Sequence, residues 1–152
     1  MLDKIILASK SKVRKEILEK HKIYCEVKPS NVDEDIVKET LIRESASPEI
    51  ISKNLAELKA NKVSTNQENR MVIGADSVID LDGELISKPE SREEALTILK
   101  KLNGKKHSLI SDSLTVSSST YDGLTSQNIL CLSKISFLTL LLDARIILFN
   151  IV

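Results

Sequence analysis

The stretch best suited to chemistry is Met71–Pro89, because it places Asp76 among apolar residues. Strand alternation over Val72–Leu81 puts Asp76 on the same face as Gly74. An ionised carboxylate in such a place needs partners or a chemical role, since burying an unpaired charge costs several kcal/mol. We expect Gly74 to leave open space beside the carboxylate, as a bound ligand would require.

Lys88 is the cation that the same stretch brings back toward this carboxylate. Asp82–Gly83 is a strong hairpin signal, so the chain is expected to turn there and to return level with Asp76. Strict pairing would put Lys88 opposite Ser77 and on the other face, so the meeting requires the strand to break at Lys88–Pro89. The alternative interpretation is a half-exposed aspartate on an edge hairpin and a solvated lysine.

A second group of candidate residues follows the first predicted strand, Lys4–Ala8. Ser11 is expected to cap the next helix, so Ser9–Ser11 would offer hydroxyls, backbone N–H groups and the positive end of the helix dipole to an anion. Arg14 lies in the first turn, where a cation is unfavourable for the helix dipole, which indicates that it interacts with a ligand. A capped surface helix with solvated cations remains the alternative.

Acidic residues and one further lysine complete the set of candidates. Asp33–Asp35 follow a predicted second strand, Tyr24–Lys28, and could bind Mg²⁺ or form a solvated loop. The helix after them is expected over Ile36–Glu44. A later helix begins at Ser47–Pro48. Lys59 lies on or beside its apolar stripe, so its side chain either reaches back to solvent or projects into a cleft. The expected stripe residues are Ile51, Leu55, Leu58 and Val63.

The elements that must position these residues alternate between strands and helices, which predicts one α/β domain. Ser91–Glu94 forms a capping box before another helix, and Asn103–Gly104 ends it. A strand is expected over His107–Val116. The residues expected on the core face of that helix are Ala95, Leu96, Ile98, Leu99 and Leu102.

Composition argues against several classes of protein. The 22 basic and 22 acidic residues among 152 cancel, and aromatic residues make up 3% of the chain, which disfavours binding to nucleic acid. Cys25 and Cys131 have no CxxC spacing, which favours a reduced, cytoplasmic protein without a zinc site. The N-terminal apolar run is too short for a signal peptide.

The C-terminal segment differs from the rest in composition. Residues 117–152 carry four charged side chains, against 40 in residues 1–116. We therefore divide the chain into a core, 1–116, and a divergent apolar tail, 117–152, in which Ser117–Asn128 is expected to be a loop. No apolar run reaches the ~18 residues of a membrane span, so no membrane partner is expected. Dimerisation or membrane association through the apolar tail is a weaker alternative.

Five motifs in order resemble the Maf proteins, a family of nucleoside triphosphate pyrophosphatases once described as septum-formation inhibitors. The chain has no glycine-rich phosphate loop, so cations and helix ends would have to hold a phosphate. The resemblance runs from Ile5 to about Val116. The motifs are L-A-S-K-S-K-V-R at Leu7–Arg14, P-S-N-V-D-E at Pro29–Glu34, N-L-A-E-L-K-A at Asn54–Ala60, G-A-D-S-V-I-D-L-D-G-E-L-I-S-K-P at Gly74–Pro89, and N-G-K-K-H at Asn103–His107.

The resemblance implies a single Maf/inosine-triphosphate-pyrophosphatase-like α/β domain, with a mixed sheet flanked by helices and a nucleotide cleft between two lobes. It implies hydrolysis of a nucleoside triphosphate to the monophosphate and pyrophosphate with a divalent metal, Mg²⁺ or Mn²⁺, and one expected role is the removal of non-canonical nucleotides. A homodimer is expected only as the weaker alternative given above, through the apolar tail. Asp76 would be the general base, and Glu34 and Asp76 would lie at the metal. The family's phosphate-binding positions fall on Ser9, Arg14, Lys59 and Lys88.

The chain departs from the family pattern at three places. Lys12 and Val13 stand where the first motif usually has proline and arginine, and Ser77 stands where threonine or glutamine often follows the aspartate. After Val116, a shorter serine- and leucine-rich tail stands in place of the family's second half. An inactive nucleotide-binding remnant, or a division-related interaction protein, is therefore the alternative function.

Overall fold

The computed structural model describes residues 5–121 and 124–131, which form a mixed sheet with helices on both faces. The strand order is β2-β1-β3-β5-β6, with β4 paired to β3; β1 runs parallel to β2 and β3, and the other pairs are antiparallel. The predicted α/β class is confirmed. The elements are β1 (Ile5–Leu7), α1 (Lys12–Lys20), β2 (Cys25–Val27), α2 (Glu34–Arg43), α3 (Pro48–Ser64), β3 (Met71–Leu81), β4 (Glu84–Ile86), α4 (Arg92–Leu102), β5 (Ser108–Tyr121) and β6 (Leu124–Cys131).

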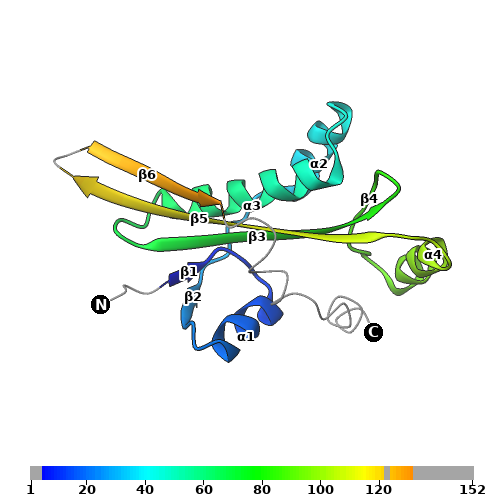
Figure 1. Ribbon diagram of the computed structural model, residues 1–152, viewed down its shortest axis with the longest axis horizontal. Coiled ribbons are helices and arrows are strands. Elements are labelled where there is room, and N and C mark those ends of the chain that lie inside the picture. Colours follow the sequence, from blue (N-terminus) through cyan, green and yellow to red (C-terminus); the bar gives the residue numbers. More distant parts are fainter. Residues whose placement is uncertain (1–4, 122–123, 132–152) are drawn as a thin grey trace.

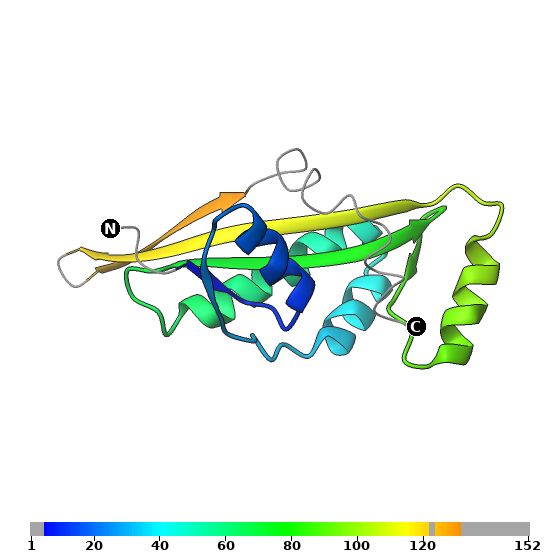
Figure 2. The same cartoon turned by 90° about the horizontal axis from the view of Figure 1, so that it is seen from below.

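Helices α1 and α3 lie on opposite faces of the sheet (Figures 1 and 2). On the α1 face, Ile73 of β3 packs with Leu7 and Leu18. On the α3 face, Val72 packs with Ile6, Ala8 and Val63, and Leu114 and Val116 of β5 pack against Ala60. Odd-numbered residues of β3 thus face α1 and even-numbered residues face α3, as strand alternation predicts.

Strand β3 is the centre of the fold, and part of one edge is open. One edge pairs with β5 along Met71–Asp80. The other edge pairs with β1 at Val72 and Ile73, and with β4 from Ile79 onward. Between these two partners, residues 74–78 have no ladder partner on that edge among the described strands. Side chains from both faces of β3 can therefore reach the same gap.

Local signals in the sequence fix the ends of the elements. Asp82 and Gly83 both have positive φ values, +52° and +88°, as a type I′ hairpin turn requires. The side chains of three serines accept a hydrogen bond from the backbone N–H three residues later, at the N-termini of α1, α3 and α4. These caps are Ser11, Ser47 and Ser91.

Other expectations are wrong in detail. Helix α2 begins at Glu34, because Asp33 acts as its N-cap and the acidic stretch is not a loop. Leu58 is 41% exposed and lies off the buried stripe of α3. In α4 only Ala95 is buried, whereas Leu96 and Leu99 are exposed, because this helix lies at the far end of the sheet (Figure 1).

The expected loop at Ser117–Asn128 is also wrong. Strand β5 continues to Tyr121 and pairs with β6 from Leu114–Cys131 to Tyr121–Leu124. The boundary at residue 116 lies within β5, and the division into residues 1–116 and 117–152 stays a prediction. No helix in the described ranges is long and apolar enough to cross a membrane.

Candidate functional site

The centre of the candidate site is a lysine held between two carboxylates from different elements. Lys59 Nζ lies 2.7 Å from Asp76 Oδ1 and 2.9 Å from Glu34 Oε1. Lys59 and Asp76 are each only 6% exposed, so this lysine projects into a cleft and does not reach back to solvent. Helix α3 supplies Lys59, strand β3 supplies Asp76, and the first turn of α2 supplies Glu34.

Arg14 forms the second cationic centre and is held on both sides by hydroxyl groups. Its Nη1 donates to Ser9 Oγ and its Nη2 to Ser77 Oγ, both at 3.1 Å. Burial lowers the pKa of Arg14, while the charges of Asp76 and Glu34 act in the opposite direction. A guanidinium remains protonated even so, which leaves a buried positive charge beside the two carboxylates.

These residues line one pocket of about 460 Å³, a size typical of small-molecule sites. The pocket lies at the open edge of β3, where Asp76 from one face and Ser77 from the other both border it. Its balance of charge favours an anion. Six cationic side chains and two carboxylates line it: Lys10, Lys12, Arg14, Lys38, Lys59 and Lys88, with Glu34 and Asp76.

The cations also determine the ionisation of Glu34. Partial burial raises the pKa of Glu34, but the hydrogen bond from Lys59 and the charges of Lys59, Lys38 and Lys88 outweigh burial and lower the pKa overall. Glu34 is therefore ionised at neutral pH.

The donor set at this place fits a hard divalent cation. Asp76 Oδ2 is buried and has no hydrogen-bond partner among the described residues, and a carboxylate oxygen of Glu34 lies on the same ammonium as Asp76 Oδ1. Mg²⁺ usually takes one or two carboxylates and completes its shell with waters and substrate phosphates. No group of three or more His, Cys, Asp or Glu side chains that could hold a metal occurs within residues 5–121 and 124–131. Glu34 and Asp76 thus suit a site that substrate helps to complete.

The expectation for Gly74 is wrong. A Cβ atom at this position would lie 2.1 Å from the backbone oxygen of Ala56, and 2.7 and 2.8 Å from N and Cβ of Ala60. The absence of a side chain therefore allows α3 to lie directly on β3, and it does not create space for a ligand. Lys59, between these two alanines, reaches Asp76 because of this close approach.

The predicted break that returns Lys88 to the site occurs, and it begins slightly earlier than expected. The pairing of β4 with β3 ends at Ile86 opposite Ile79. After that residue the chain leaves the ladder, and Lys88 lines the pocket with Asp76. The structure therefore brings all six candidate residues to one pocket: Ser9, Arg14, Glu34, Lys59, Asp76 and Lys88.

Two residues at the site were not predicted from the sequence. Lys38 lines the pocket one helical turn after Glu34, with Nζ 4.0 Å from Glu34 Oε2. The i,i+4 spacing would have indicated it, had the helix been expected to begin at Glu34. Ser111 contacts Ser77 from β5, and only the register between β3 and β5 reveals that contact.

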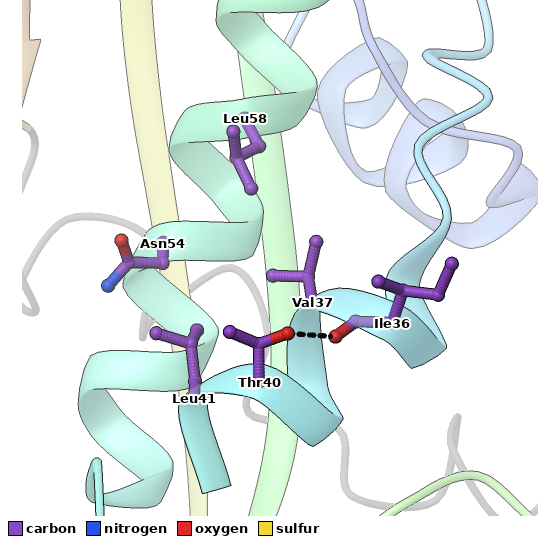
Figure 3. A pocket seen from close by; sticks show the side chains of 6 residues that line it. All are labelled: Ile36, Val37, Thr40, Leu41, Asn54 and Leu58. Atoms are coloured by element: carbon purple, nitrogen blue, oxygen red, sulfur yellow. Dashed lines mark hydrogen bonds between the residues drawn. The ribbon is translucent and has the colours of Figure 1, made fainter. Parts of the chain in front are cut away.

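A second, smaller pocket of about 200 Å³ lies between α2 and α3 (Figure 3). Its two polar groups bond within their own helices: Thr40 Oγ1 donates to the Ile36 carbonyl and Asn54 Nδ2 to the Ile50 carbonyl, both at 2.8 Å. No charged side chain lines it, so it is a packing groove and offers no catalytic groups. Its lining residues are Ile36, Val37, Thr40, Leu41, Asn54 and Leu58.

The fold and the site define an α/β protein with a buried carboxylate–lysine centre in a cation-lined pocket. The family model described as Maf-like protein matches residues 4–141. A nucleoside triphosphate pyrophosphatase of Pelagibacter ubique (strain HTCC1062) is 65% identical over 111 residues, which cover 73% of this chain and 57% of that protein.

Two further relatives agree with that match. A nucleoside triphosphate pyrophosphatase of Ruegeria pomeroyi (strain ATCC 700808 / DSM 15171 / DSS-3) is 44% identical over 70% of this chain and 54% of its own length. A dTTP/UTP pyrophosphatase of Ruminiclostridium cellulolyticum (strain ATCC 35319 / DSM 5812 / JCM 6584 / H10) is 36% identical over 70% and 52%. The chain belongs to the Maf family. It spans about half the length of these curated relatives.

Proposed function

We propose that this chain hydrolyses a nucleoside triphosphate between the α- and β-phosphates, giving the monophosphate and pyrophosphate. The observation that carries the proposal is the buried Asp76–Lys59–Glu34 cluster at the wall of a pocket lined mainly by cations. The names of three relatives, two nucleoside triphosphate pyrophosphatases and one dTTP/UTP pyrophosphatase, support the same reaction.

In this mechanism Asp76 is the general base that takes a proton from the attacking water. Its Oδ1 accepts from Lys59, which leaves Oδ2 as the acceptor for the water proton. A general base needs an oxygen that is free to accept a proton, and Oδ2 is that oxygen here. Lys59 therefore orients the base, and in the transition state its charge also stabilises the oxygens of the substrate.

The remaining cations hold the phosphates. Charge moves onto the leaving pyrophosphate during the reaction, and fixed cations that are already in place stabilise that charge. Arg14 with Ser9, and Lys88 after the hairpin, are assigned to this role, since each lines the pocket with Asp76. Glu34 and Asp76 would hold a Mg²⁺ or Mn²⁺ ion, which when bound neutralises phosphate charge and activates water.

The test is pyrophosphate release from a panel of canonical and modified nucleoside triphosphates. Wild type and Asp76→Asn are compared with Mg²⁺ or Mn²⁺ present, and again with a chelator. The proposal expects turnover by wild type that is lost with either change, and a preference for modified nucleotides would make this a house-cleaning enzyme. Folded wild-type protein that releases no pyrophosphate from any nucleotide refutes the proposal, and nucleotide binding that survives Asp76→Ala would then favour an inactive nucleotide-binding remnant.

A further inference from the structure

A chain of hydroxyl groups links the pocket to the interior of the sheet. Arg14 Nη2 donates to Ser77 Oγ, and Ser77 Oγ lies 2.8 Å from Ser111 Oγ. Ser111 is 8% exposed, and it is not among the residues that line the pocket. Any effect of Ser111 on a ligand must therefore pass through Ser77 and Arg14.

The sheet fixes the distance between these two serines. Ser77 and Ser111 lie directly opposite each other in the antiparallel pairing of β3 with β5, on the face covered by α1. Directly opposite residues have neighbouring Cβ atoms whose separation is set by the ladder. The guanidinium of Arg14 is thus anchored to two paired strands through Ser77, and to the β1–α1 loop through Ser9.

The hydrogen-bond donors and acceptors around Ser77 give Ser111 a specific role. Arg14 can only donate, so one lone pair of Ser77 Oγ is already occupied. The second bond, to Ser111, fixes the rotamer of Ser77 whichever hydroxyl donates. When Ser111 donates, both lone pairs of Ser77 are used, and the remaining Ser77 proton is available to a ligand in the pocket. Without Ser111, Ser77 can rotate, and Arg14 loses one of its two fixed acceptors.

We propose that Ser111 is a positioning residue that holds the guanidinium of Arg14 in the orientation needed to bind the substrate phosphates. The consequence for catalysis rests on the function proposed above. A guanidinium binds a phosphate best through two parallel N–H groups, so its orientation matters as well as its charge. Loss of one supporting hydrogen bond is expected to weaken substrate binding about five- to tenfold.

The strand offers a matched control for this proposal. Ser113 lies two residues further along β5 on the same face, is 5% exposed, and its Oγ has no hydrogen-bond partner among the described residues. Ser111→Ala and Ser113→Ala therefore remove the same atom from the same kind of environment, with and without the contact to Ser77. Ser111→Thr keeps the hydroxyl at a strand position that tolerates threonine, and it is the conservative rescue.

The first measurement uses the protein without ligand and does not depend on the reaction. The side-chain N–H signals of Arg14 are assigned by NMR from their absence in Arg14→Lys, and the rate of guanidinium rotation is measured. Ser111→Ala is expected to speed this rotation severalfold, whereas Ser113→Ala and Ser111→Thr leave it close to wild type. Equal rotation rates in Ser111→Ala and wild type overturn the proposal.

The second measurement is kinetic and uses the full chain with Mg²⁺. Ser111→Ala is expected to raise KM about five- to tenfold with kcat within about twofold, because Arg14 binds the phosphates in the ground state as well. In an Arg14→Lys background, the same substitution should have little further effect. Additive effects, or an equal rise in KM from Ser113→Ala, contradict the proposal. Absence of any turnover in wild type would refute the proposed function, and the NMR measurement would still decide the role of Ser111.

Discussion

Replacing Gly74 by alanine is the sharpest test of how the fold builds the site. The added Cβ would lie 2.1 Å from the backbone oxygen of Ala56, so that oxygen must move by about 1.3 Å to reach the 3.4 Å of an ordinary contact. Because the close atoms include helix backbone, no side-chain rotation relieves the clash. Helix α3 as a whole must move away from β3, and it carries Lys59 with it.

The magnitude follows from that geometry. Overpacking in a core costs about 1–3 kcal/mol, and a contact with backbone belongs at the upper end of this range. For a chain of this size, about 3 kcal/mol corresponds to a fall in Tm of roughly 6–12 °C. A displacement of the same order would lengthen the 2.7 Å contact between Lys59 and Asp76 beyond hydrogen-bonding distance. Gly74→Ala should therefore lose both stability and the contact between Lys59 and Asp76.

The assay is urea unfolding of Gly74→Ala beside Gly104→Ala. Gly104 has a φ of +71°, and a Cβ added there would meet no atom within 4 Å, so alanine introduces backbone strain of about 1–2 kcal/mol without moving α3. Ala60→Gly combined with Gly74→Ala should rescue little, because the oxygen of Ala56 and the N atom of Ala60 remain. A loss below about 0.5 kcal/mol in Gly74→Ala would refute this account of α3 packing.

Three further predictions concern the acidic residues and their lysine. Lys59→Met removes the cation that is hydrogen-bonded to Asp76, while the charge of Arg14 stays nearby, and should lower the free energy of unfolding by about 3–5 kcal/mol. Added Mn²⁺ should then raise Tm more than in wild type, and equal shifts would contradict this. The folded-state pKa of Glu34 lies below its unfolded value of about 4.3, so its contribution to the free energy of unfolding is present above that pH and is lost as pH falls through the folded pKa. Measured by urea unfolding between about pH 3 and 6, the free energy of unfolding should therefore fall less steeply with decreasing pH in Glu34→Gln than in wild type. Asp33→Ala should destabilise α2 by about 0.5–2 kcal/mol, because Asp33 Oδ1 accepts a hydrogen bond from the backbone N–H of Ile36. Mn²⁺ binding should not weaken in this variant, and that result would distinguish a helix cap from a metal ligand.

Much of the fold follows from short-range signals in the sequence. The alternation in β3, the Asp82–Gly83 turn and the serine caps each depend on neighbouring residues only, and each is observed. Lys59 was expected beside a buried stripe, and the choice between solvent and cleft needed the position of β3. That choice depends on contacts between residues 17 positions apart, which periodicity cannot supply.

The role of Gly74 shows the same limit more clearly. A glycine in a strand indicates that something approaches closely, but the sequence does not say whether a ligand or another segment of backbone approaches. The structure identifies the approaching group as helix α3. Ser111 is a similar case, because its importance depends on which residue lies opposite it in the neighbouring strand of the sheet.

The open edge of β3 explains why strict alternation gives an incomplete picture of the site. Asp76 and Ser77 are consecutive, so alternation assigns them to opposite faces and predicts that they serve different environments. In a strand paired on both edges, that separation would hold. Here β1 ends its pairing at Ile73 and β4 begins at Ile79, so both faces of the intervening segment border one gap. Lys59 from the α3 face and Arg14 from the α1 face can then act on one ligand, which neither helix could do across a continuous sheet.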